Sequence, residues 1–174
     1  MKYFAYGSNM LTERFRARVC GAVALSQVCV CGYRLRFHKR SEDGSGKCNI
    51  IETGSQEDRV YGVVFEIPKE QLEKLDVVEG YGKGYVHKYI PLPNRPNENA
   101  LAYVAEPKYI DDELSPYSWY HGLVIAGAEQ HALPVNYIEE LRKQGWKEDP
   151  QPNRSSKLEA EKLLQDYRKT SKKA

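Results

Sequence analysis

The segment Tyr6-Gly7-Ser8-Asn9 has the residue types of a tight turn between a strand and a helix. Small and turn-forming residues at such a point leave backbone N–H groups pointing outward, where they can bind a carboxylate or an oxyanion. Gly, Ser and Asn are also simply favourable turn residues, and Asn9 or Thr12 could cap the following helix. The residues alone leave an anion site and a plain turn both open.

Glu79 is the second candidate, in the segment Asp76-Val77-Val78-Glu79-Gly80. At the C-terminal end of a helix its carboxylate faces the negative end of the helix dipole, which disfavours the ionised form. Burial by Val77 and Val78 would act in the same direction. A carboxyl group of this kind can serve as a general acid or base near neutral pH. The alternative is a solvated glutamate in front of a glycine that ends the helix.

Other motifs argue against nucleotides, metals and a serine nucleophile. Gly80, Gly82 and Gly84 are spaced as G-x-G-x-G, which is not the dinucleotide fingerprint, and they precede a strand. The four histidines are scattered and form no metal-ligand motif. No G-x-S-x-G sequence surrounds a serine. We therefore expect no metal and no nucleotide.

The cysteines and arginines are expected to have no role in chemistry. The four cysteines contain no C-x-x-C pair, which agrees with a reducing, cytoplasmic compartment. Cys29 and Cys31 are two residues apart, and we expect them as small buried residues on one face of a strand. We expect two sets of basic side chains to be solvated at the surface. They are Arg14, Arg16 and Arg18, and Arg34, Arg36 and His38.

Composition limits the class of protein. The chain has 174 residues and a formal net charge of +2, which fits one domain and argues against an electrostatic nucleic-acid binder. No apolar stretch approaches the ~20 residues that cross a bilayer, and the N-terminus lacks a secretion signal, so we expect no membrane association. The chain has 13 Tyr against 4 Phe, and a Tyr-rich set favours polar clefts.

The elements that would position these residues follow from patterning and turn signals. We expect strands near residues 2–6, 25–38, 47–52, 60–67, 85–92 and 100–105, and helices near 10–18, 68–80, 119–131, 134–143 and 156–167. This order predicts an α+β fold with a mixed sheet and helices packed outside it. We expect a domain over residues 1–148, followed over 149–174 by a linker, a C-terminal helix and a frayed tail from Lys169.

Two segments taken together resemble the gamma-glutamylcyclotransferase family. They are Tyr6-Gly7-Ser8-Asn9-Met10 and Leu75-Asp76-Val77-Val78-Glu79-Gly80. Tyr61-Gly62-Val63-Val64-Phe65 is similar to the family strand that precedes the catalytic helix, and residues 120–137 resemble its C-terminal helical segment. The resemblance covers about residues 2–143. It implies a small mixed β-barrel-like sheet flanked by helices.

The resemblance also implies a reaction. A gamma-glutamyl amide is cleaved by intramolecular cyclisation, which releases 5-oxoproline and a free amino acid or amine without a cofactor. By matching position, Glu79 would be the general acid/base and the Tyr6–Met10 backbone would hold the gamma-glutamyl group. Tyr85, Tyr103 and Tyr120 would line the pocket. The partner is then a small gamma-glutamyl molecule, and the oligomeric state stays open, a homodimer included.

Some features depart from the family, and alternatives remain. The glutathione-specific relatives carry Y-G-S-L, which Asn9-Met10-Leu11 does not match, so that subgroup is disfavoured. The same chemistry could instead remove a gamma-glutamyl protecting group from a biosynthetic intermediate. A non-enzymatic ligand-binding module on the same fold is the alternative from another class.

Overall fold

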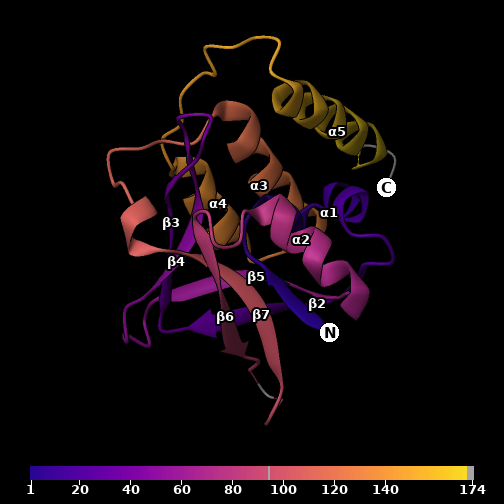
Figure 1. Ribbon diagram of the computed structural model, residues 1–174, viewed down its shortest axis with the longest axis vertical. Coiled ribbons are helices and arrows are strands. Elements are labelled where there is room, and N and C mark those ends of the chain that lie inside the picture. Colours follow the sequence, from indigo (N-terminus) through magenta and orange to yellow (C-terminus); the bar gives the residue numbers. More distant parts are fainter. Residues whose placement is uncertain (94, 172–174) are drawn as a thin grey trace.

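The computed structural model describes residues 1–93 and 95–171 (Figure 1). Its strands are β1 (Lys2–Ala5), β2 (Val23–Cys31), β3 (Tyr33–Arg40), β4 (Gly46–Glu52), β5 (Arg59–Glu66), β6 (Tyr85–Pro91) and β7 (Asn99–Ala105). Its α-helices are α1 (Thr12–Arg18), α2 (Leu72–Glu79), α3 (Ser118–Gln130), α4 (Val135–Lys143) and α5 (Ser155–Ser171). Short 3₁₀ turns are η1 (Ser8–Met10), η2 (Lys69–Gln71) and η3 (Pro107–Tyr109).

The strands form a mixed sheet and a separate hairpin. The sheet has the order β2-β5-β1-β7-β6, and β1 pairs antiparallel with β5 and parallel with β7. Strands β3 and β4 form a two-stranded sheet of their own. The predicted α+β fold, a mixed sheet flanked by helices, is confirmed. The sheet is not closed into a barrel.

Strand β5 is largely buried in the apolar core, as its sequence predicts. Val60, Val63, Val64 and Phe65 are buried, and β-branched and aromatic side chains suit such a strand. Its Gly62 is required by a close approach, because a Cβ there would lie 2.4 Å from the carbonyl oxygen of Ala5 in β1. Strand β1 therefore lies directly against β5 and carries the chain into η1.

Helix α2 ends where the sequence predicts. Gly80 follows it in the left-handed conformation, with φ of 72°, and its N–H bonds back to the Asp76 and Val77 carbonyls. Glycine adopts this conformation without the steric cost of a Cβ. Glu79 is thus the last helical residue, and the turn of the chain at Gly80 fixes the direction in which its side chain leaves the helix.

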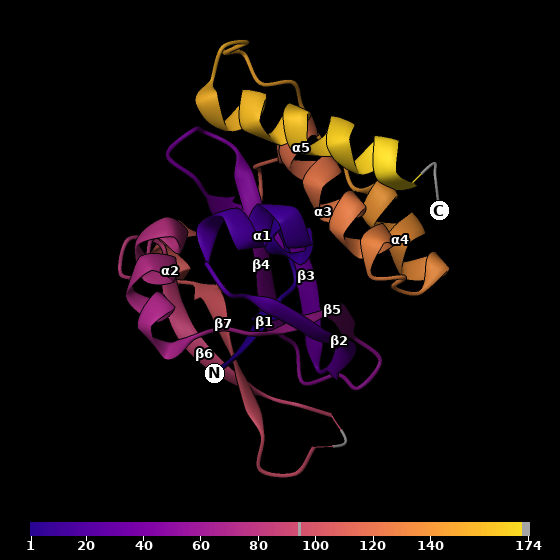
Figure 2. The same ribbon diagram turned by 90° about the vertical axis from the view of Figure 1, so that its right-hand side faces the viewer.

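Helices α1 and α3 both pack against η1, the turn that follows β1. Helix α3 is buried along most of its length and packs against η1, α4 and α5. In Figure 2, α5 runs along the top of the molecule, with α3 and α1 below it. Ala160 and Leu164 of α5 are buried, as their helical spacing predicts.

The predicted strand over 25–38 is wrong, because two strands of different sheets occupy it. Gly32, with φ of 82°, separates β2 from β3. Cys31 is exposed and Cys29 half-buried, so the expected buried pair does not exist. A register shift between Arg36 and Lys39 breaks the alternation of β3. His38 is consequently buried instead of solvated.

The C-terminal prediction needs one correction. Residues 169–171 belong to α5 and are not a frayed tail, whereas residues 172–174 lie outside the described part of the chain. Over residues 1–93 and 95–171, no helix is long and apolar enough to cross a membrane. The same residues contain no group of three His, Cys, Asp or Glu side chains able to hold a metal ion.

Candidate active site

A small cavity of about 30 Å³ lies where η1, the end of α2, β4 and α3 meet. It is lined by Tyr3, Tyr6, Gly7, Ser8, Asn9, Cys48, Glu79, Tyr85, Tyr103 and Tyr120. Of the residues that the sequence analysis assigned to catalysis or substrate binding, all except Met10 line this one cavity. The volume is room for about one water molecule, so a larger guest must extend into the adjoining cavity described below.

Glu79 faces this cavity with one oxygen held and one free. Its Oε1 accepts hydrogen bonds from Asn9 Nδ2 at 2.9 Å and from Arg18 Nη1 at 3.1 Å. Within residues 1–93 and 95–171, Oε2 accepts no hydrogen bond. The Glu79 side chain is 16% exposed. A carboxylate fixed in this way presents Oε2 to a guest with little freedom to rotate.

The two valines before Glu79 are not what buries it. Val77 is 82% and Val78 40% exposed, although Val78 also lines the adjoining cavity described below. The burial comes instead from the N-terminal segment, where Asn9 also donates to the Tyr3 hydroxyl at 3.0 Å. Glu79 is therefore enclosed by residues some 70 positions earlier in the sequence.

The Gly7–Asn9 turn makes the floor of the cavity. Ser8 and Asn9 are buried, and the first N–H groups of a 3₁₀ turn have no acceptor within it. Gly7 is needed for close packing, because a Cβ there would lie 3.0 Å from Cys48 Cβ and 3.3 Å from the Tyr120 hydroxyl. The interpretation of Asn9 as a helix cap is wrong, since its side chain bonds to Tyr3 and Glu79.

Met10 does not line the cavity, contrary to the prediction. Its side chain is fully buried, and its N–H is already donated to the Gly7 carbonyl at 3.0 Å. Gly127 of α3 lies directly against it, because a Cβ at Gly127 would be 2.6 Å from Met10 Cβ. Met10 thus anchors the turn to α3, and residues 7–9 are the part of the turn that lines the cavity.

The tyrosines form a hydrogen-bonded wall. The Tyr6 hydroxyl donates to the Tyr103 carbonyl, and the Tyr85 hydroxyl donates to the Cys48 carbonyl at 2.6 Å. Cys48 N–H donates in turn to the Tyr120 hydroxyl at 3.1 Å. Burial raises the pKa of Tyr6, Tyr85 and Tyr120 well above the ordinary value. These phenols are therefore neutral at physiological pH.

Two further groups at the site were not found from the sequence. Arg18, expected as a solvated side chain, is the cationic partner of Glu79. Asp76 accepts hydrogen bonds at its Oδ1 from the Tyr103 hydroxyl at 2.5 Å and from His87 Nε2 at 2.6 Å. The spacing of Asp76 and Glu79 places both on one face of α2, and this signal could have been used. No local signal predicts the role of Arg18, because its contact with Glu79 joins helices α1 and α2 across 61 residues of sequence.

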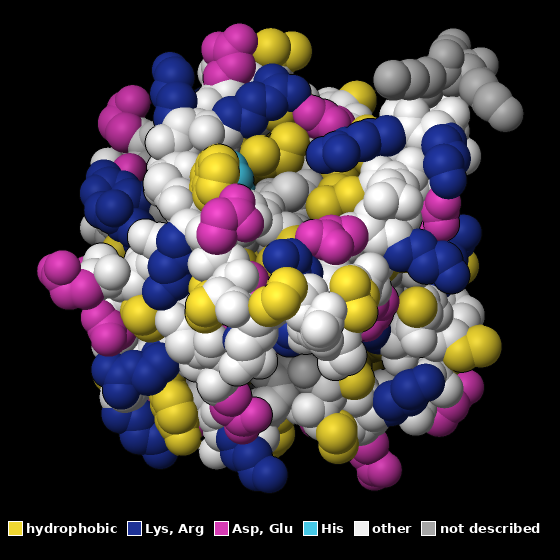
Figure 3. Space-filling view, turned by 90° about the horizontal axis from the view of Figure 1, so that it is seen from above, with side chains coloured by type: hydrophobic (Ala, Val, Ile, Leu, Met, Phe, Trp, Pro, Cys, Tyr) yellow, Lys and Arg dark blue, Asp and Glu magenta, His cyan; other side chains and the backbone are white. Residues whose placement is uncertain are grey.

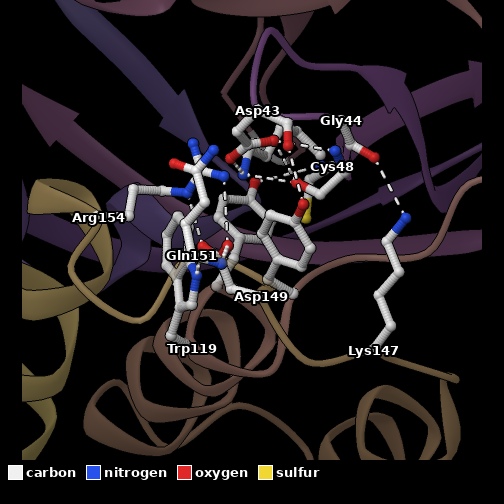
Figure 4. Close-up of polar contacts among 12 residues, drawn as sticks. Asp43, Gly44, Cys48, Trp119, Lys147, Asp149, Gln151 and Arg154 are labelled. Carbon is white, nitrogen blue, oxygen red and sulfur yellow. Dashed lines mark hydrogen bonds and ion pairs between the residues drawn. The ribbon is translucent and has the colours of Figure 1, made fainter.

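A second cavity of about 260 Å³ adjoins the first and shares Ser8, Glu79, Tyr85 and Tyr120 with it. Asp43 and Trp119, which line the second cavity, belong to the polar network in Figure 4. There the Tyr117 hydroxyl donates to the Asp43 carbonyl at 2.8 Å, and Lys147 donates to the Gly44 carbonyl at 3.2 Å. The loop between β3 and β4 is thereby tied to α3 and to the segment that leads into α5.

The chain was compared with known proteins. Residues 59–141 match the AIG2-like family. A gamma-glutamylcyclotransferase of Bos taurus is 32% identical over 146 residues, which are 80% of this chain and 76% of the bovine protein. The gamma-glutamylcyclotransferase of Homo sapiens is 31% identical over 145 residues, again 80% and 76% of the two chains. The chain belongs to the gamma-glutamylcyclotransferase family.

Solved structures agree with this family. A structure named gamma-glutamyl cyclotransferase superposes with a TM-score of 0.82 at 25% identity, covering 95% of this chain and 98% of that one. The human protein described as uncharacterized protein loc79017 gives a TM-score of 0.79 at 26% identity, covering 94% and 97%. As a member of the gamma-glutamylcyclotransferase family, this chain is an enzyme.

Proposed function

We propose that this enzyme cleaves gamma-glutamyl amides by intramolecular cyclisation, with Glu79 as the general acid/base. The observation that carries the proposal is the meeting of the Gly7–Asn9 turn and Glu79 in one cavity, joined by the 2.9 Å bond between Asn9 Nδ2 and Glu79 Oε1. Its substrate is a small molecule with a gamma-glutamyl group, and its products are 5-oxoproline and the free amine.

The chemistry needs no protein nucleophile, because the substrate carries its own. Glu79 Oε2 takes a proton from the α-ammonium group, and the freed amine attacks the γ-carbonyl carbon. Ring closure within one molecule supplies a large effective-molarity advantage. Glu79 returns this proton to the leaving nitrogen as the bond to the γ-carbon breaks. It then takes the second proton from the ring nitrogen, which keeps one as the lactam N–H, and passes it to the released amine. Every proton and atom of the substrate is recovered in the two products.

The surrounding groups have supporting roles in this proposal. The backbone N–H groups of the Gly7–Asn9 turn donate to the oxygens of the gamma-glutamyl group. Tyr85, Tyr103 and Tyr120 form the walls. The Tyr85 and Tyr103 hydroxyls already donate to the Cys48 carbonyl and to Asp76, whereas the Tyr120 hydroxyl accepts from Cys48 N–H and keeps its own proton for a ligand. Asn9 and Arg18 hold Oε1 of Glu79 so that the remaining oxygen faces the reacting nitrogen.

A panel of gamma-glutamyl dipeptides and amines, assayed for 5-oxoproline, tests the proposal. We expect turnover of at least one member, and Glu79→Gln should lower the rate by about 100-fold or more, because a positioned acid/base contributes that much. Glu73→Gln is the matched control. Glu73 lies exposed on the same helix, so this substitution should leave the rate unchanged.

Two results would contradict the proposal: no 5-oxoproline from any panel member, or full activity of Glu79→Gln. The panel also addresses the alternative of a deprotecting enzyme, which would turn over one biosynthetic conjugate and neglect simple dipeptides. A non-enzymatic module would be favoured by a shallow, unpaired Glu79. The carboxylate is instead largely buried and paired with Arg18, which supports the enzymatic reading.

A further inference from the structure

The 260 Å³ cavity beside Glu79 is lined by an excess of basic side chains. They are Arg14, Arg18, Lys39 and Lys47. Two of them are matched by carboxylates. Arg18 pairs with Glu79 at 3.1 Å, and Lys47 pairs with Asp43 at 2.7 Å. The other two lack such a close partner within the described residues: Arg14 has only the Glu159 carboxylate, 3.9 Å from its Nη1, and Lys39 is in no ion pair.

Arg14 is a buried guanidinium with unused donors. Its side chain is 5% exposed, and among the residues that the structure describes its Nε and Nη1 have no hydrogen-bond partner. The Glu159 carboxylate lies 3.9 Å from Nη1, beyond hydrogen-bond reach, and its side chain is 56% exposed. Burial, together with the charge of Arg18, lowers the pKa of Arg14 to about 10. A buried donor without an acceptor is costly, so an anion from outside would satisfy it.

Lys39 is the second unmatched cation. Its ammonium lies 4.7 Å from the centre of the Tyr85 ring, and the described residues place no carboxylate in an ion pair with it. Burial lowers the pKa of Lys39, although Glu79, Glu42 and Asp43 act to raise it. Burial is also the main cause that lowers the pKa of Lys47, and the charges of Arg14 and Lys39 add to it. The cavity therefore holds about two positive charges more than its carboxylates balance.

We infer that this cavity is a leaving-group site for a γ-glutamyl conjugate whose amine is an acidic amino acid, with two carboxylates. The inference rests on the proposed function. The two cavities share Ser8, Glu79, Tyr85 and Tyr120, so a scissile amide at Glu79 directs its leaving group into the larger one. The planar fork of Arg14 suits one carboxylate, and the compact ammonium of Lys39 suits the other.

The test compares γ-glutamyl-glutamate with γ-glutamyl-glutamine, which have the same shape and differ by one charge. We expect kcat/KM for the acidic leaving group to be about 10-fold higher or more, because a hydrogen bond to a charged group is worth that factor. Whichever of Arg14→Met and Lys39→Met removes the partner of the side-chain carboxylate should bring the ratio towards 1. The other should lower kcat/KM for both dipeptides, because γ-glutamyl-glutamine keeps the α-carboxylate. Arg16→Met is the matched control, on the exposed side of the same helix, and should keep the wild-type ratio.

Glu159→Gln provides an independent variant on an exposed side chain, so folding is not at risk. It removes a carboxylate that competes for Arg14, and we expect the acidic preference to increase. A wild-type ratio of 1 or below would overturn the inference, as would a preference unchanged in all three variants. These outcomes differ from failure of the proposed function, in which neither dipeptide yields 5-oxoproline. If Arg14→Met does not fold, Lys39→Met and Glu159→Gln decide the question.

Discussion

At the scale of single residues, the site depends on how one carboxylate is held. Asn9 and Arg18 both bond to Oε1 of Glu79 and leave Oε2 free within the described chain. The two partners differ in kind, because Arg18 supplies charge and Asn9 supplies direction. Asn9 is itself fixed by the Tyr3 hydroxyl at 3.0 Å. The orientation of the Glu79 carboxylate is thus set from the N-terminal strand.

Replacing Asn9 tests this orientation directly. Asn9→Ala removes the bond to Glu79 Oε1 and also the Oδ1 that accepts from Arg18 Nη1 at 3.1 Å, while the opposite charges of Arg18 and Glu79 remain. We expect kcat to fall by about 10- to 100-fold with a smaller change in KM. Steady-state assay of 5-oxoproline measures both constants. Asn153→Ala, in the exposed segment before α5, serves as control. A fall confined to KM would instead assign Asn9 to substrate binding alone.

The site residues fall into two groups by how they could be predicted. Tyr6–Asn9 and Glu79 carry local signals, a turn at a strand end and an acid before a helix-ending glycine. Arg14 and Arg18 carry none, because alternating arginines on a short helix look solvated until α2 and α5 pack against them. Their roles depend on contacts that span 61 residues in one case and more than 140 in the other.

At the scale of elements, the packing of α3 on η1 sets the position of the turn. A Cβ at Gly127 would lie 2.5 Å from the Leu11 nitrogen and 2.6 Å from Met10 Cβ. Neither atom can move without moving the backbone of the turn. At Gly122 of the same helix, a Cβ would meet only the flexible end of Leu164 at 3.1 Å. Gly127→Ala and Gly122→Ala therefore form a test variant and its control on one helix.

We expect Gly127→Ala to lower the free energy of unfolding by about 1–3 kcal/mol or more, since overpacking strains a well-packed contact. It should also lower kcat, because η1 carries residues 8 and 9 of the site. Gly122→Ala should change stability by less than about 1 kcal/mol, as the gain in helix propensity offsets the small displacement of Leu164. Urea unfolding and the 5-oxoproline assay measure the two effects. Equal stability of the two variants would contradict this account.

The elements themselves were largely predictable, because periodicity and turn residues are local. Helix α2 with its terminal Gly80, strand β5 and the buried helix α3 all appear where the sequence indicates. The split of residues 25–38 between two sheets was not predicted, since one glycine in a strand pattern does not reveal a change of sheet. The register shift in β3 likewise depends on its partner β4 and has no signal of its own.

At the scale of the whole molecule, one buried carboxylate joins the C-terminal segment to the rest. Asp149 accepts hydrogen bonds from Trp119 Nε1 at 3.0 Å, from Arg154 Nε at 2.7 Å and from Gln151 N–H at 2.9 Å (Figure 4). Burial acts to raise the pKa of Asp149, but these hydrogen bonds prevail and hold it at about 2, against an ordinary value of 3.8. Asp149 thereby fixes the segment that delivers α5 to the rim of the larger cavity.

The Asp149 carboxylate makes the free energy of unfolding depend on pH. Because the folded pKa lies below the unfolded one, the stabilisation is complete above about pH 4 and is lost as pH falls towards about 2. We expect Asp149→Asn to lower the free energy of unfolding by about 2 kcal/mol at pH 7. The difference from wild type should shrink over that acidic range in urea titrations. Asp166→Asn, on the exposed face of α5, should show neither effect.

The surface of the molecule is evenly mixed in charge on the face that carries α5. Figure 3 shows Lys and Arg side chains interspersed there with Asp and Glu. Arg14 and Lys39, by contrast, are buried and line the larger cavity. The positive electrostatic potential inside a cavity acts on a ligand that enters the cavity, and it acts little on a macromolecule that stays outside.

The distribution of the thiols has a practical consequence. Cys48 lies in the wall of the smaller cavity, where burial raises the pKa of its thiol to about 12, whereas Cys20 and Cys31 are exposed. The thiolate is the reactive form, so maleimide reagents will select the two exposed positions. Dyes or surface linkers attached there leave the cavity chemically untouched. The native cysteines therefore already provide handles for single-molecule or immobilised assays of this enzyme.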